Sequence, residues 1–333
     1  MKSLLSKLFD RNDLTQDEAF EAMDIMMSGD TSSEHMAAFL GALRGKGEST
    51  DELIGFARSL REHARPIEAI DRTLIDTCGT GGDGSQTYNI STTCAFIIAA
   101  ADLGVVKHGN RAQSSKCGSA DVLEALNIPI DLPPEKVKES VEKTGFGFLF
   151  APLFHPAMKH VAGVRKQLGL RTAFNLLGPI VNPAKTKRQV MGVYDGRLLE
   201  QIAEVLKALG TIEAILVSGL DGMDEISLVA PSQIVHLKAG AIQSLTIRPE
   251  DFGIKRCEIC DLKGGDAIQN AQILTDILSG KDKGPKRDIA LINSAAALVV
   301  GGKVKGLSDG VSLARQLIDS GKALHVLESA RNA

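Results

Sequence analysis

The stretch Asp76-Thr-Cys-Gly-Thr-Gly-Gly-Asp-Gly84 follows the short apolar run Leu74-Ile75 and precedes Asn89-Ile-Ser-Thr92. Four of the six residues in the glycine loop, Gly79–Gly84, are glycines. Such a loop can adopt positive φ and bring its backbone N–H groups against a ligand. The apolar stretch 93–103 that follows suits a helix. Strand, glycine loop and helix N-terminus in succession make a site for phosphate-type anions, so this segment predicts an α/β fold.

Composition limits the classes of function. The 333 residues are 44% hydrophobic and 24% charged, as in a soluble globular protein with one large domain or two ordinary ones. The net charge of -3 gives no electrostatic reason to expect nucleic acid or an anionic membrane as partner. No stretch approaches the roughly 18 to 20 apolar residues that span a bilayer, and the start lacks signal-peptide features. The five scattered cysteines are typical of a reducing compartment, so we expect a cytoplasmic protein.

The chain divides into two predicted domains. Residues 1–70 carry only helix signals, including the capping boxes Thr15-x-x-Glu18 and Ser49-x-x-Glu52. We expect this helical unit to be a small all-α domain. Part of 155–185, where the pattern is helical again, is expected to join it. Residues 71–333 are predicted to form a larger α/β domain.

The α/β domain is predicted from short strands that alternate with helices, which indicates a mainly parallel central sheet flanked by helices. The stretch 225–248 indicates antiparallel hairpins instead, with extended runs near 226–229, 234–237 and 242–247, and helices return from residue 265. The expected strands are Leu74–Asp76, Val105–Lys107, Phe148–Phe150, Val190–Val193 and Ala214–Val217. The expected helices lie near 91–103, 119–126, 135–143, 155–168 and 198–209.

The glycine loop by itself is compatible with several ligands. It formally satisfies G-x-G-x-x-G, the dinucleotide fingerprint, which also needs an acidic residue at the end of the second strand. Here that strand ends in Lys107 and His108, which suits phosphate better than a ribose diol and leaves NADP open. No Gly-Lys-Ser/Thr follows the loop, so a P-loop is excluded. A tight turn without a ligand remains the simplest alternative.

A second loop, Lys107–Ser119, again joins a predicted strand to a predicted helix. Lys107 and Arg111 supply charge, while Asn110 and several serines supply neutral donors. Ser119 also fits a helix N-cap. Two such loops at the edge of a parallel sheet where ligands bind predict a substrate with more than one phosphate group.

A third polar segment, Asp221–Glu225, follows the expected strand Ala214–Val217. It can be a simple turn before a hairpin. However, the adjacent carboxylates of Asp224 and Glu225 are hard oxygen ligands, and Mg²⁺ binds through one or two carboxylates, water and substrate phosphates. With two phosphate loops nearby, this segment predicts a magnesium site.

Taken together, these segments resemble the anthranilate phosphoribosyltransferase family. The likeness runs from the first helices to about residue 325, in the same order and at similar spacing. It implies a helical domain that carries a homodimer interface, the substrates phosphoribosyl pyrophosphate (PRPP) and anthranilate, and one or two Mg²⁺ ions per monomer. The matching stretches are Gly79–Gly84, Asn89–Thr92, Lys107–Ser115, Gly118–Leu126, Phe148–Pro152, Arg171–Pro179, Asp221–Glu225 and Gly264–Asp266.

The resemblance also implies site residues. Magnesium would be bound by Ser91, through its hydroxyl, and by Asp224 and Glu225. Catalysis and contact with the acceptor would fall to Lys107, His108, Asn110 and Arg165, with Gly79 beside the acceptor. PRPP would be bound by Gly79, Gly82, Asp83, Thr87, Asn89, Ile90, Ser91, Thr92, Lys107, Gly109, Asn110, Arg111, Ser114, Ser115 and Ser119.

The implied reaction is attack of the anthranilate amine on C1 of the ribose of PRPP, giving N-(5-phosphoribosyl)anthranilate and pyrophosphate, the second step of tryptophan biosynthesis from chorismate. An aromatic amine is already neutral near neutral pH, so the reaction needs no strong base. Lys107 and the loop N–H groups would stabilise the departing pyrophosphate. The fork of Arg165 matches a carboxylate bidentately, although a solvated charge is the alternative. His108 either steers the amine or packs.

Two other functional classes stay open at this point. A pyrimidine-nucleoside phosphorylase shares the expected architecture and a glycine loop, but its corresponding loops lack the Asn-Arg-x-x-Ser-Ser run and the Asp-Glu pair. A non-catalytic relative that binds nucleic acid or another polyanion should be basic and should lack the magnesium carboxylates. A NAD(P) dehydrogenase is a more distant alternative.

The pair Cys257-x-x-Cys260 gives the first testable prediction. One such pair cannot complete a zinc site without further ligands. Replacing both residues, Cys257→Ser with Cys260→Ser, should therefore leave the zinc content and the activity of the purified protein unchanged. Folding that becomes dependent on zinc would contradict this interpretation.

Overall fold

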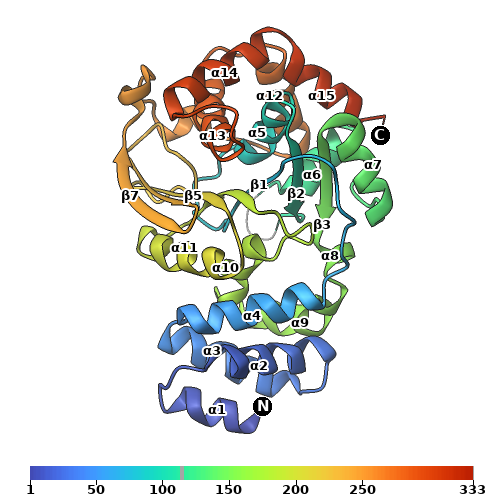
Figure 1. Ribbon diagram of the computed structural model, residues 1–333, viewed down its shortest axis with the longest axis vertical. Coiled ribbons are helices and arrows are strands. Elements are labelled where there is room, and N and C mark those ends of the chain that lie inside the picture. Colours follow the sequence, from blue (N-terminus) through green and yellow to red (C-terminus); the bar gives the residue numbers. More distant parts are fainter. Residues whose placement is uncertain (113–115, 333) are drawn as a thin grey trace.

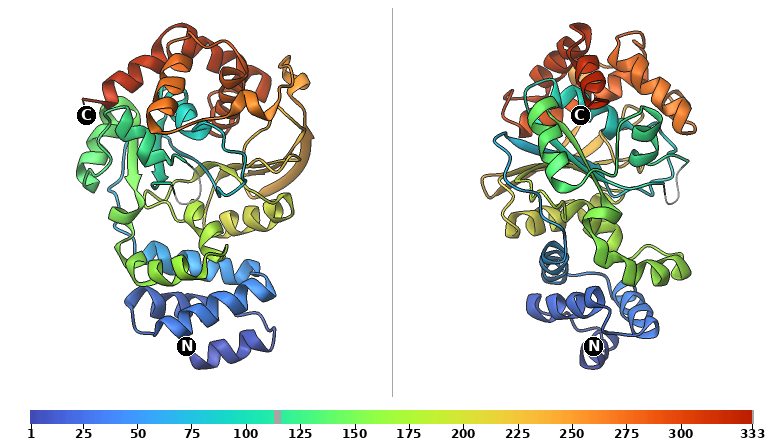
Figure 2. Two further views of the ribbon diagram at one scale, coloured as in Figure 1. Left: turned by 180° about the vertical axis from the view of Figure 1, so that it is seen from behind. Right: turned by 90° about the vertical axis from the view of Figure 1, so that its right-hand side faces the viewer.

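The computed structural model describes residues 1–112 and 116–332. The N-terminal helices form one end of the molecule, and an α/β part with the C-terminal helices forms the other (Figure 1). The views from behind and from the side show the same two-part arrangement (Figure 2). No helix among the described residues is long and apolar enough to cross a membrane.

The helical unit consists of α1 (Lys2–Phe9), α2 (Gln16–Ser28), α3 (Ser33–Lys46) and α4 (Thr50–Glu62). Both predicted capping boxes form, at the starts of α2 and α4. Glu52, in the second box, is fully buried and accepts hydrogen bonds from the Leu14 backbone N–H at 3.0 Å and the Lys46 ammonium at 2.9 Å. These bonds satisfy a charge that burial would otherwise make costly.

The described residues form one seven-stranded sheet in the order β3-β2-β1-β4-β5-β6-β7. The five predicted strands all form and pair in parallel, and β6 and β7 continue the sheet as antiparallel strands. The mainly parallel α/β fold predicted from the sequence is therefore confirmed. The strands are β1 (Leu74–Gly79), β2 (Gly104–Gly109), β3 (Phe146–Phe150), β4 (Arg188–Gly192), β5 (Glu213–Gly219), β6 (Ser232–Lys238) and β7 (Ala241–Ile247).

Helices cover both faces of the sheet. One face packs against α5 (Ile90–Ala99) and α13 (Pro285–Val300), and the other packs against α11 (Leu199–Ala208) and α7 (Pro134–Thr144). The parallel strands are consequently largely buried, as expected when both faces of a sheet are covered, whereas β7 is mostly exposed. The remaining helices are α6 (Ser119–Ala125), α8 (Ala151–Phe154), α9 (Lys159–Leu168), α10 (Ala173–Ile180), α12 (Ala267–Leu278), α14 (Leu307–Asp319) and α15 (Lys322–Ala330), with single 3₁₀ turns at 156–158, 196–198, 249–252 and 259–262.

Two helices from the middle of the chain pack on the helical unit. α9 contacts α2 and α3, and α10 contacts α3 and α4. Their buried side chains belong to a hydrophobic cluster that also includes α1–α4 and one face of the sheet, at β4, β5 and β6. The domain boundary at residue 70 and the assignment of part of 155–185 to the helical domain remain predictions.

The hairpin prediction for 225–248 was partly wrong. β6 and β7 form a hairpin, but the stretch 226–229 is irregular. The Asn293 side chain accepts from the Ile226 N–H at 2.8 Å and donates to the Ile226 carbonyl at 3.0 Å. The Ser227 N–H donates to the Ser232 hydroxyl. Side chains thus satisfy backbone groups that a strand ladder would otherwise bind.

Candidate active site

Three polar segments meet at one edge of the sheet. The glycine loop follows β1, the second loop follows β2, and Asp221–Glu225 follows β5. Since β2 and β4 flank β1 and β5 lies next to β4, the carboxyl ends of these parallel strands open on the same side. This is the edge at which open α/β sheets bind ligands.

The glycine loop approaches Asp224 closely. Gly81 and Gly82 have φ values of 67° and 73°, which residues other than glycine rarely adopt. In this conformation the Gly81 N–H donates to Oδ2 of Asp224 at 2.7 Å. The first loop and the third polar segment are therefore in direct contact.

Two strand ends leave room for Asp224. A Cβ on Gly79 would lie 2.3 Å from the Asp224 Oδ2, and a Cβ on Gly192 would lie 1.5 Å from the Asp224 backbone oxygen. A side chain on Gly79 would displace the carboxylate, and one on Gly192 would displace the Asp224 backbone. The glycines of β1 and β4 thus fix where Asp224 lies.

The carboxylates at this edge repel one another. Burial, followed by repulsion from Asp83, raises the pKa of Asp224 to about 6. Burial and the adjacent Asp224 raise the pKa of Glu225 well above its usual value, while the Lys107 ammonium acts in the opposite direction. An oxygen-rich site with too little positive charge favours a bound cation.

Lys107 lies beneath the loops. Its side chain is only 2% exposed, and its ammonium donates to the Thr77 carbonyl at 2.6 Å and the Ser91 hydroxyl at 3.1 Å. In this structure, Lys107 therefore contacts the protein groups that shape the site. Burial raises the pKa of Asp76 and Glu225, and the charge of Lys107 acts in the opposite direction on both.

The N-terminus of the helix that follows the glycine loop lies at this edge of the sheet. α5 has Asn89 as its N-cap, but the Asn89 side chain makes no capping bond. Instead, that side chain donates to the Cys117 carbonyl and accepts from Asn270 at 2.9 Å. The Ile90 N–H donates to the Tyr88 carbonyl at 2.7 Å. The positive end of the α5 dipole, at Ile90, Ser91 and Thr92, still favours an anion. Asn270 is a supporting residue that no local sequence signal identified.

Thr87 precedes this helix in a short backbone bridge to Lys263. The two residues are far apart in the sequence and are joined by antiparallel pairing. The bridge holds the end of the glycine loop against the segment before α12. Gly264, in that segment, passes so close to Tyr88 that a Cβ would lie 2.7 Å from its Cα.

The second loop is only partly described, and Ser114 and Ser115 lie outside the described residues. Arg111 forms ion pairs with Glu124 and with Asp121 of α6, so its charge faces that helix. The Ser119 hydroxyl donates to the Asn110 carbonyl at 3.3 Å, in the space that a side chain on Gly109 would fill. The N-cap of α6 is Gly118 rather than Ser119, because the Asp121 carboxylate accepts from the Gly118 N–H.

His108 lies on the side of the site that faces α10. Its Nδ1 lies 3.2 Å from the Gly178 carbonyl. A carbonyl can only accept, so Nδ1 carries the proton and Nε2 presents a lone pair. Burial lowers the pKa of His108 to about 3, and the neutral ring keeps that acceptor.

The sequence analysis missed a second histidine. His155 lies 5.0 Å from His108 between ring centres, and burial lowers its pKa to about 4. The Nε2 atoms of both rings are buried, and within the described part of the chain neither has a hydrogen-bond partner. Buried polar atoms without partners are uncommon and indicate a place where a ligand can bind. His155 stands next to Pro156 at a helix start, and nothing in its local pattern points to a site.

Arg165 lies on α9 with its guanidinium 5.0 Å from the centre of the Phe174 ring. Burial lowers its pKa. Among the described residues, no ion pair or side-chain hydrogen bond involves this guanidinium. A partly buried arginine without a carboxylate partner suits an anionic ligand.

The third polar segment cannot hold a metal ion with protein side chains alone. The described part of the chain contains no cluster of three or more His, Cys, Asp or Glu side chains arranged for a metal. A cation at Asp224 and Glu225 would need additional oxygen atoms from water or from a substrate. That pattern is typical of Mg²⁺ bound with a phosphorylated substrate.

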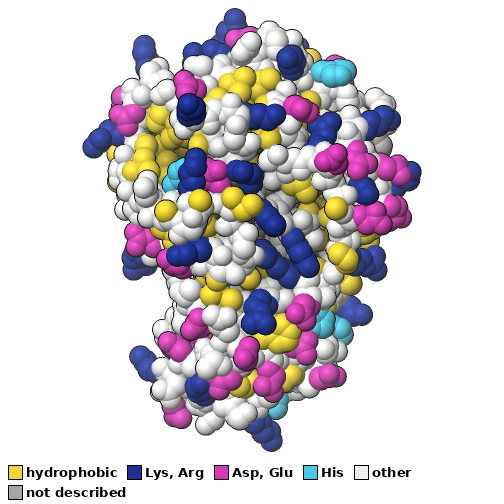
Figure 3. Space-filling view, in the orientation of Figure 1, with side chains coloured by type: hydrophobic (Ala, Val, Ile, Leu, Met, Phe, Trp, Pro, Cys, Tyr) yellow, Lys and Arg dark blue, Asp and Glu magenta, His cyan; other side chains and the backbone are white. Residues whose placement is uncertain are grey.

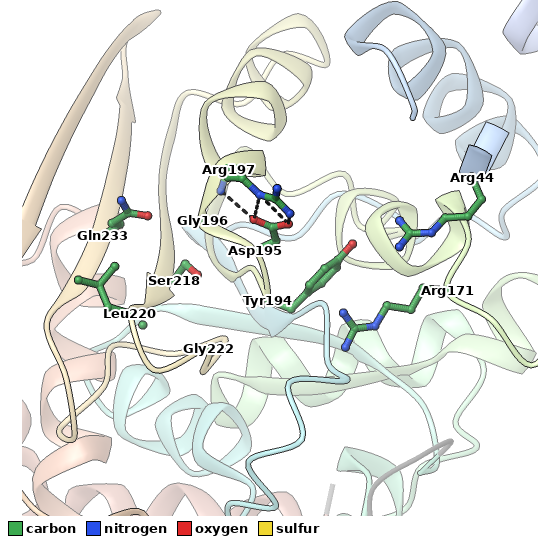
Figure 4. Close-up of a pocket in the computed structure, with 11 residues that line it drawn as sticks. Arg44, Arg171, Tyr194, Asp195, Gly196, Arg197, Ser218, Leu220, Gly222 and Gln233 are labelled. Carbon is green, nitrogen blue, oxygen red and sulfur yellow. Dashed lines mark hydrogen bonds and ion pairs between the residues drawn. The ribbon is translucent and has the colours of Figure 1, made fainter. Parts of the chain in front are cut away.

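A separate cavity of about 500 Å³ opens on the outer side of the glycine loop (Figure 4). It lies between α3 of the helical unit and the ends of β4 and β5, and none of the predicted site residues lines it. Lys and Arg side chains gather across the middle of the face shown in Figure 3. The lining residues are Arg44, Arg171, Tyr194, Asp195, Gly196, Arg197, Ser218, Gly219, Leu220, Gly222 and Gln233.

Two family models match the chain. The model for the glycosyl transferase family, a/b domain, matches residues 71–324. The model for the helical bundle domain of the same family matches residues 2–64. Together they span most of the chain.

Curated relatives match over nearly the whole length. An anthranilate phosphoribosyltransferase from Moorella thermoacetica is 50% identical over 99% of this chain and 97% of its own length. The enzyme of that name from Symbiobacterium thermophilum is also 50% identical, with the same coverage.

Solved structures agree with these relatives. The anthranilate phosphoribosyltransferase from Thermus thermophilus has a TM-score of 0.94 and 42% identity, covering 99% of this chain and 98% of that one. The enzyme from Saccharomyces cerevisiae in complex with PRPP and Mg has a TM-score of 0.91 and 28% identity, covering 99% and 96%. A second yeast structure holds 4-fluoroanthranilate, with a TM-score of 0.89, 27% identity and the same coverage.

The raised pKa of Asp224 predicts that this residue lowers stability. Its folded-state pKa, about 6, exceeds the ordinary value of 3.8. The contribution of Asp224 to the free energy of unfolding is therefore favourable at low pH. It is lost as the pH rises from about 3.8 to about 6. Without Mg²⁺ at pH 7.5, the variant Asp224→Asn should raise the free energy of unfolding by on the order of 1 kcal/mol, measured by urea denaturation.

The increase in the free energy of unfolding caused by Asp224→Asn should become smaller towards pH 4. A matched control is Asp221→Asn, in the same turn, whose carboxylate accepts from the Ser227 hydroxyl and the Met223 N–H; it should bring no gain. An Asp224→Asn variant that is less stable than the wild type at pH 7.5 would contradict the electrostatic interpretation.

Proposed function

The chain belongs to the anthranilate phosphoribosyltransferases of the glycosyl transferase family, and from this premise we propose that it transfers the phosphoribosyl group of PRPP to the amine of anthranilate. The products are N-(5-phosphoribosyl)anthranilate and pyrophosphate. The observation that carries this proposal is the meeting of two anion-binding loops and the Asp224-Glu225 pair at one edge of the sheet.

The donor site uses both loops. The exposed glycine loop offers backbone N–H groups, and the N-terminus of α5 offers the positive end of its dipole, to the phosphates of PRPP. Asn110, Ser119 and Arg111 of the second loop complete the site, and Arg111 must turn from its ion pairs with α6 to reach the ligand. The other proposed PRPP contacts are Gly79, Gly82, Asp83, Thr87, Asn89, Ile90, Ser91, Thr92, Lys107, Gly109, Ser114 and Ser115.

Mg²⁺ fits the carboxylates next to this site. Asp224, Glu225 and the Ser91 hydroxyl are hard oxygen donors. Burial raises the pKa of both carboxylates, and repulsion from neighbouring carboxylates adds to it. When bound, one or two Mg²⁺ ions would neutralise charge on the departing pyrophosphate. Lys107 already donates to Ser91, so it orients that hydroxyl while its own charge favours the anionic product.

The reaction forms a bond between the amine nitrogen and C1 of the ribose and breaks the bond between C1 and a pyrophosphate oxygen. The amine nitrogen then releases one proton to the departing pyrophosphate or to water. The neutral amine attacks without prior deprotonation, so positioning and charge stabilisation supply most of the rate. His108 presents a hydrogen-bond acceptor at Nε2. This atom would accept a hydrogen bond from an N–H group of the amine and so orient the amine. Asn110 would line the same side.

Arg165 and His155 are proposed to hold the acceptor. The unpaired Arg165 guanidinium matches the anthranilate carboxylate. His155, beside His108, would line the other side of the aromatic ring. Homodimerisation through the helical unit and a cytoplasmic location are further proposals, drawn from the family resemblance and from the sequence.

The proposed function is tested by the loss of anthranilate fluorescence on adding PRPP and Mg²⁺. Quinolinate and nicotinate serve as control acceptors, and phosphorolysis of thymidine or uridine tests the nucleoside phosphorylase alternative. Asp224→Asn should reduce kcat/KM by roughly 100-fold or more, as the loss of a group that stabilises the leaving group does. An unchanged kcat/KM would exclude Asp224 as a magnesium ligand.

Arg165→Ala should raise the KM for anthranilate about 10- to 100-fold, because a charge-assisted pair to the carboxylate is lost. The KM for PRPP should change less than about threefold. Lys166→Ala, at the exposed neighbouring position of α9, is the matched control and should leave both KM values unchanged. An equal rise for both substrates would argue against carboxylate recognition by Arg165.

A further inference from the structure

The link between α9 and α10 contacts the glycine loop. Arg171 lies in this link, after the end of α9 at Leu168 and just before Thr172, the N-cap of α10. Its guanidinium donates a hydrogen bond through Nη2 to the Gly82 carbonyl. Because α9 and α10 pack on the helical unit, this bond joins that unit to the loop.

Tyr194 contacts both Arg171 and the glycine loop. The Arg171 guanidinium lies 4.1 Å from the centre of the Tyr194 ring, and Figure 4 shows the two side chains together in the cavity. The Tyr194 N–H donates to the Thr80 hydroxyl at 3.0 Å, and the Thr80 N–H donates to the Gly192 carbonyl at 2.9 Å. The loop is thus anchored to the end of β4 at Thr80 and to Arg171 at Gly82.

The glycine loop needs such an anchor. Gly81 and Gly84 have positive φ, and among the described residues a Cβ on either would meet no atom within 4 Å. Glycine backbones lose much conformational freedom when they become ordered. In this structure the Gly81 N–H is held by Asp224, the residue assigned above to the metal. Arg171 holds the loop at a different group, the Gly82 carbonyl.

Another arginine of the cavity serves as a comparison. Arg197 is strongly exposed, and its guanidinium pairs with Asp195 through both carboxylate oxygens. Arg171, in contrast, binds a backbone carbonyl of the glycine loop. The two residues share the cavity and the charge but differ in what they contact.

We propose that Arg171 is a positioning residue that holds the glycine loop in its ligand-binding conformation and couples it to the acceptor side of the site. The coupling follows from the chain, because Arg165 and Arg171 flank the same turn, in which the Gly169 N–H donates to the Arg165 carbonyl. A ligand that orders Arg165 also orders the link that carries Arg171. This inference rests on the proposed function, in which the loop binds the diphosphate of PRPP.

Coupling of this kind is reciprocal, so each substrate should raise the affinity for the other by the same factor. In the wild type, Mg²⁺–pyrophosphate bound at the loop should strengthen anthranilate binding. Pyrophosphate cannot react with anthranilate, so both affinities can be measured at equilibrium by isothermal titration calorimetry. The coupling factor is the ratio of anthranilate Kd values without and with Mg²⁺–pyrophosphate.

Arg171→Ala should raise the KM for PRPP roughly tenfold, as the loss of a partly solvated charged hydrogen bond does. The KM for anthranilate should rise less, and the coupling factor should fall towards one. Arg171→Lys keeps a donor for the Gly82 carbonyl but loses the planar stacking on Tyr194. Its KM for PRPP and its coupling factor should therefore lie between those of Arg171→Ala and the wild type. Tyr194→Phe keeps the ring and should resemble the wild type.

Arg197→Ala is the matched control, and its KM values and coupling factor should equal those of the wild type. The Tm of each variant shows whether it is folded. A normal KM for PRPP in Arg171→Ala, or an equal effect of Arg197→Ala, would overturn the positioning role. A raised KM with an unchanged coupling factor would overturn the coupling. A wild type without turnover would contradict the proposed function, while the Mg²⁺–pyrophosphate titrations of the same variants would still decide the role of Arg171.

Discussion

The close approach of one carboxylate to the glycine loop organises this protein. Asp224 lies where the Cβ atoms of Gly79 and Gly192 would otherwise be, and it accepts the Gly81 N–H. This contact requires glycine at the ends of β1 and β4 and positive φ in the loop. It also requires β5 to lie next to β4, because the segment that carries Asp224 follows β5. The sheet order, the loop conformation and the acidic pair are therefore parts of one geometric constraint.

The electrostatics of the site follow from that constraint. Asp83, Asp224 and Glu225 act on one another at partly buried positions, and the nearby cation, Lys107, is occupied with Thr77 and Ser91. Burial also raises the pKa of Asp76, beneath the loop, to about 6. Separating such charges from water is costly, and proteins retain costly groups of this kind mainly at functional sites. The arrangement is prepared for a cation and an anionic substrate that arrive together.

The acceptor side is organised by the end of α10. The His108 ring binds the Gly178 carbonyl, Gln189 binds the Pro179 carbonyl at 2.7 Å, and Arg61 of α4 binds the Ile180 carbonyl at 2.8 Å. The carbonyls at a helix C-terminus lack partners within the helix, and here the sheet and the helical unit supply them. The same short helix thus fixes the tautomer of His108 and joins the two parts of the molecule. The link that precedes it carries Arg171, which donates to the Gly82 carbonyl of the glycine loop, so one connecting segment contacts both the glycine loop and His108.

The sequence by itself determined the elements and the chemistry that each loop carries. Local backbone preference is visible in the strand and helix periods, the capping boxes and the glycine-rich segment. The strands and the helical unit of the structure agree with these predictions. Two of the three polar segments are also in contact, as expected from their places after parallel strands. Tertiary structure decided which distant groups meet. Asn270 supports Asn89 from 181 residues away, and His155 and Arg171 gain their surroundings only when α9 and α10 pack. The stretch 226–229 has strand-like residues, yet the Asn293 side chain takes its backbone bonds. A local pattern records what a segment can do alone, whereas a buried polar group is satisfied by whichever partner the packed chain brings to it.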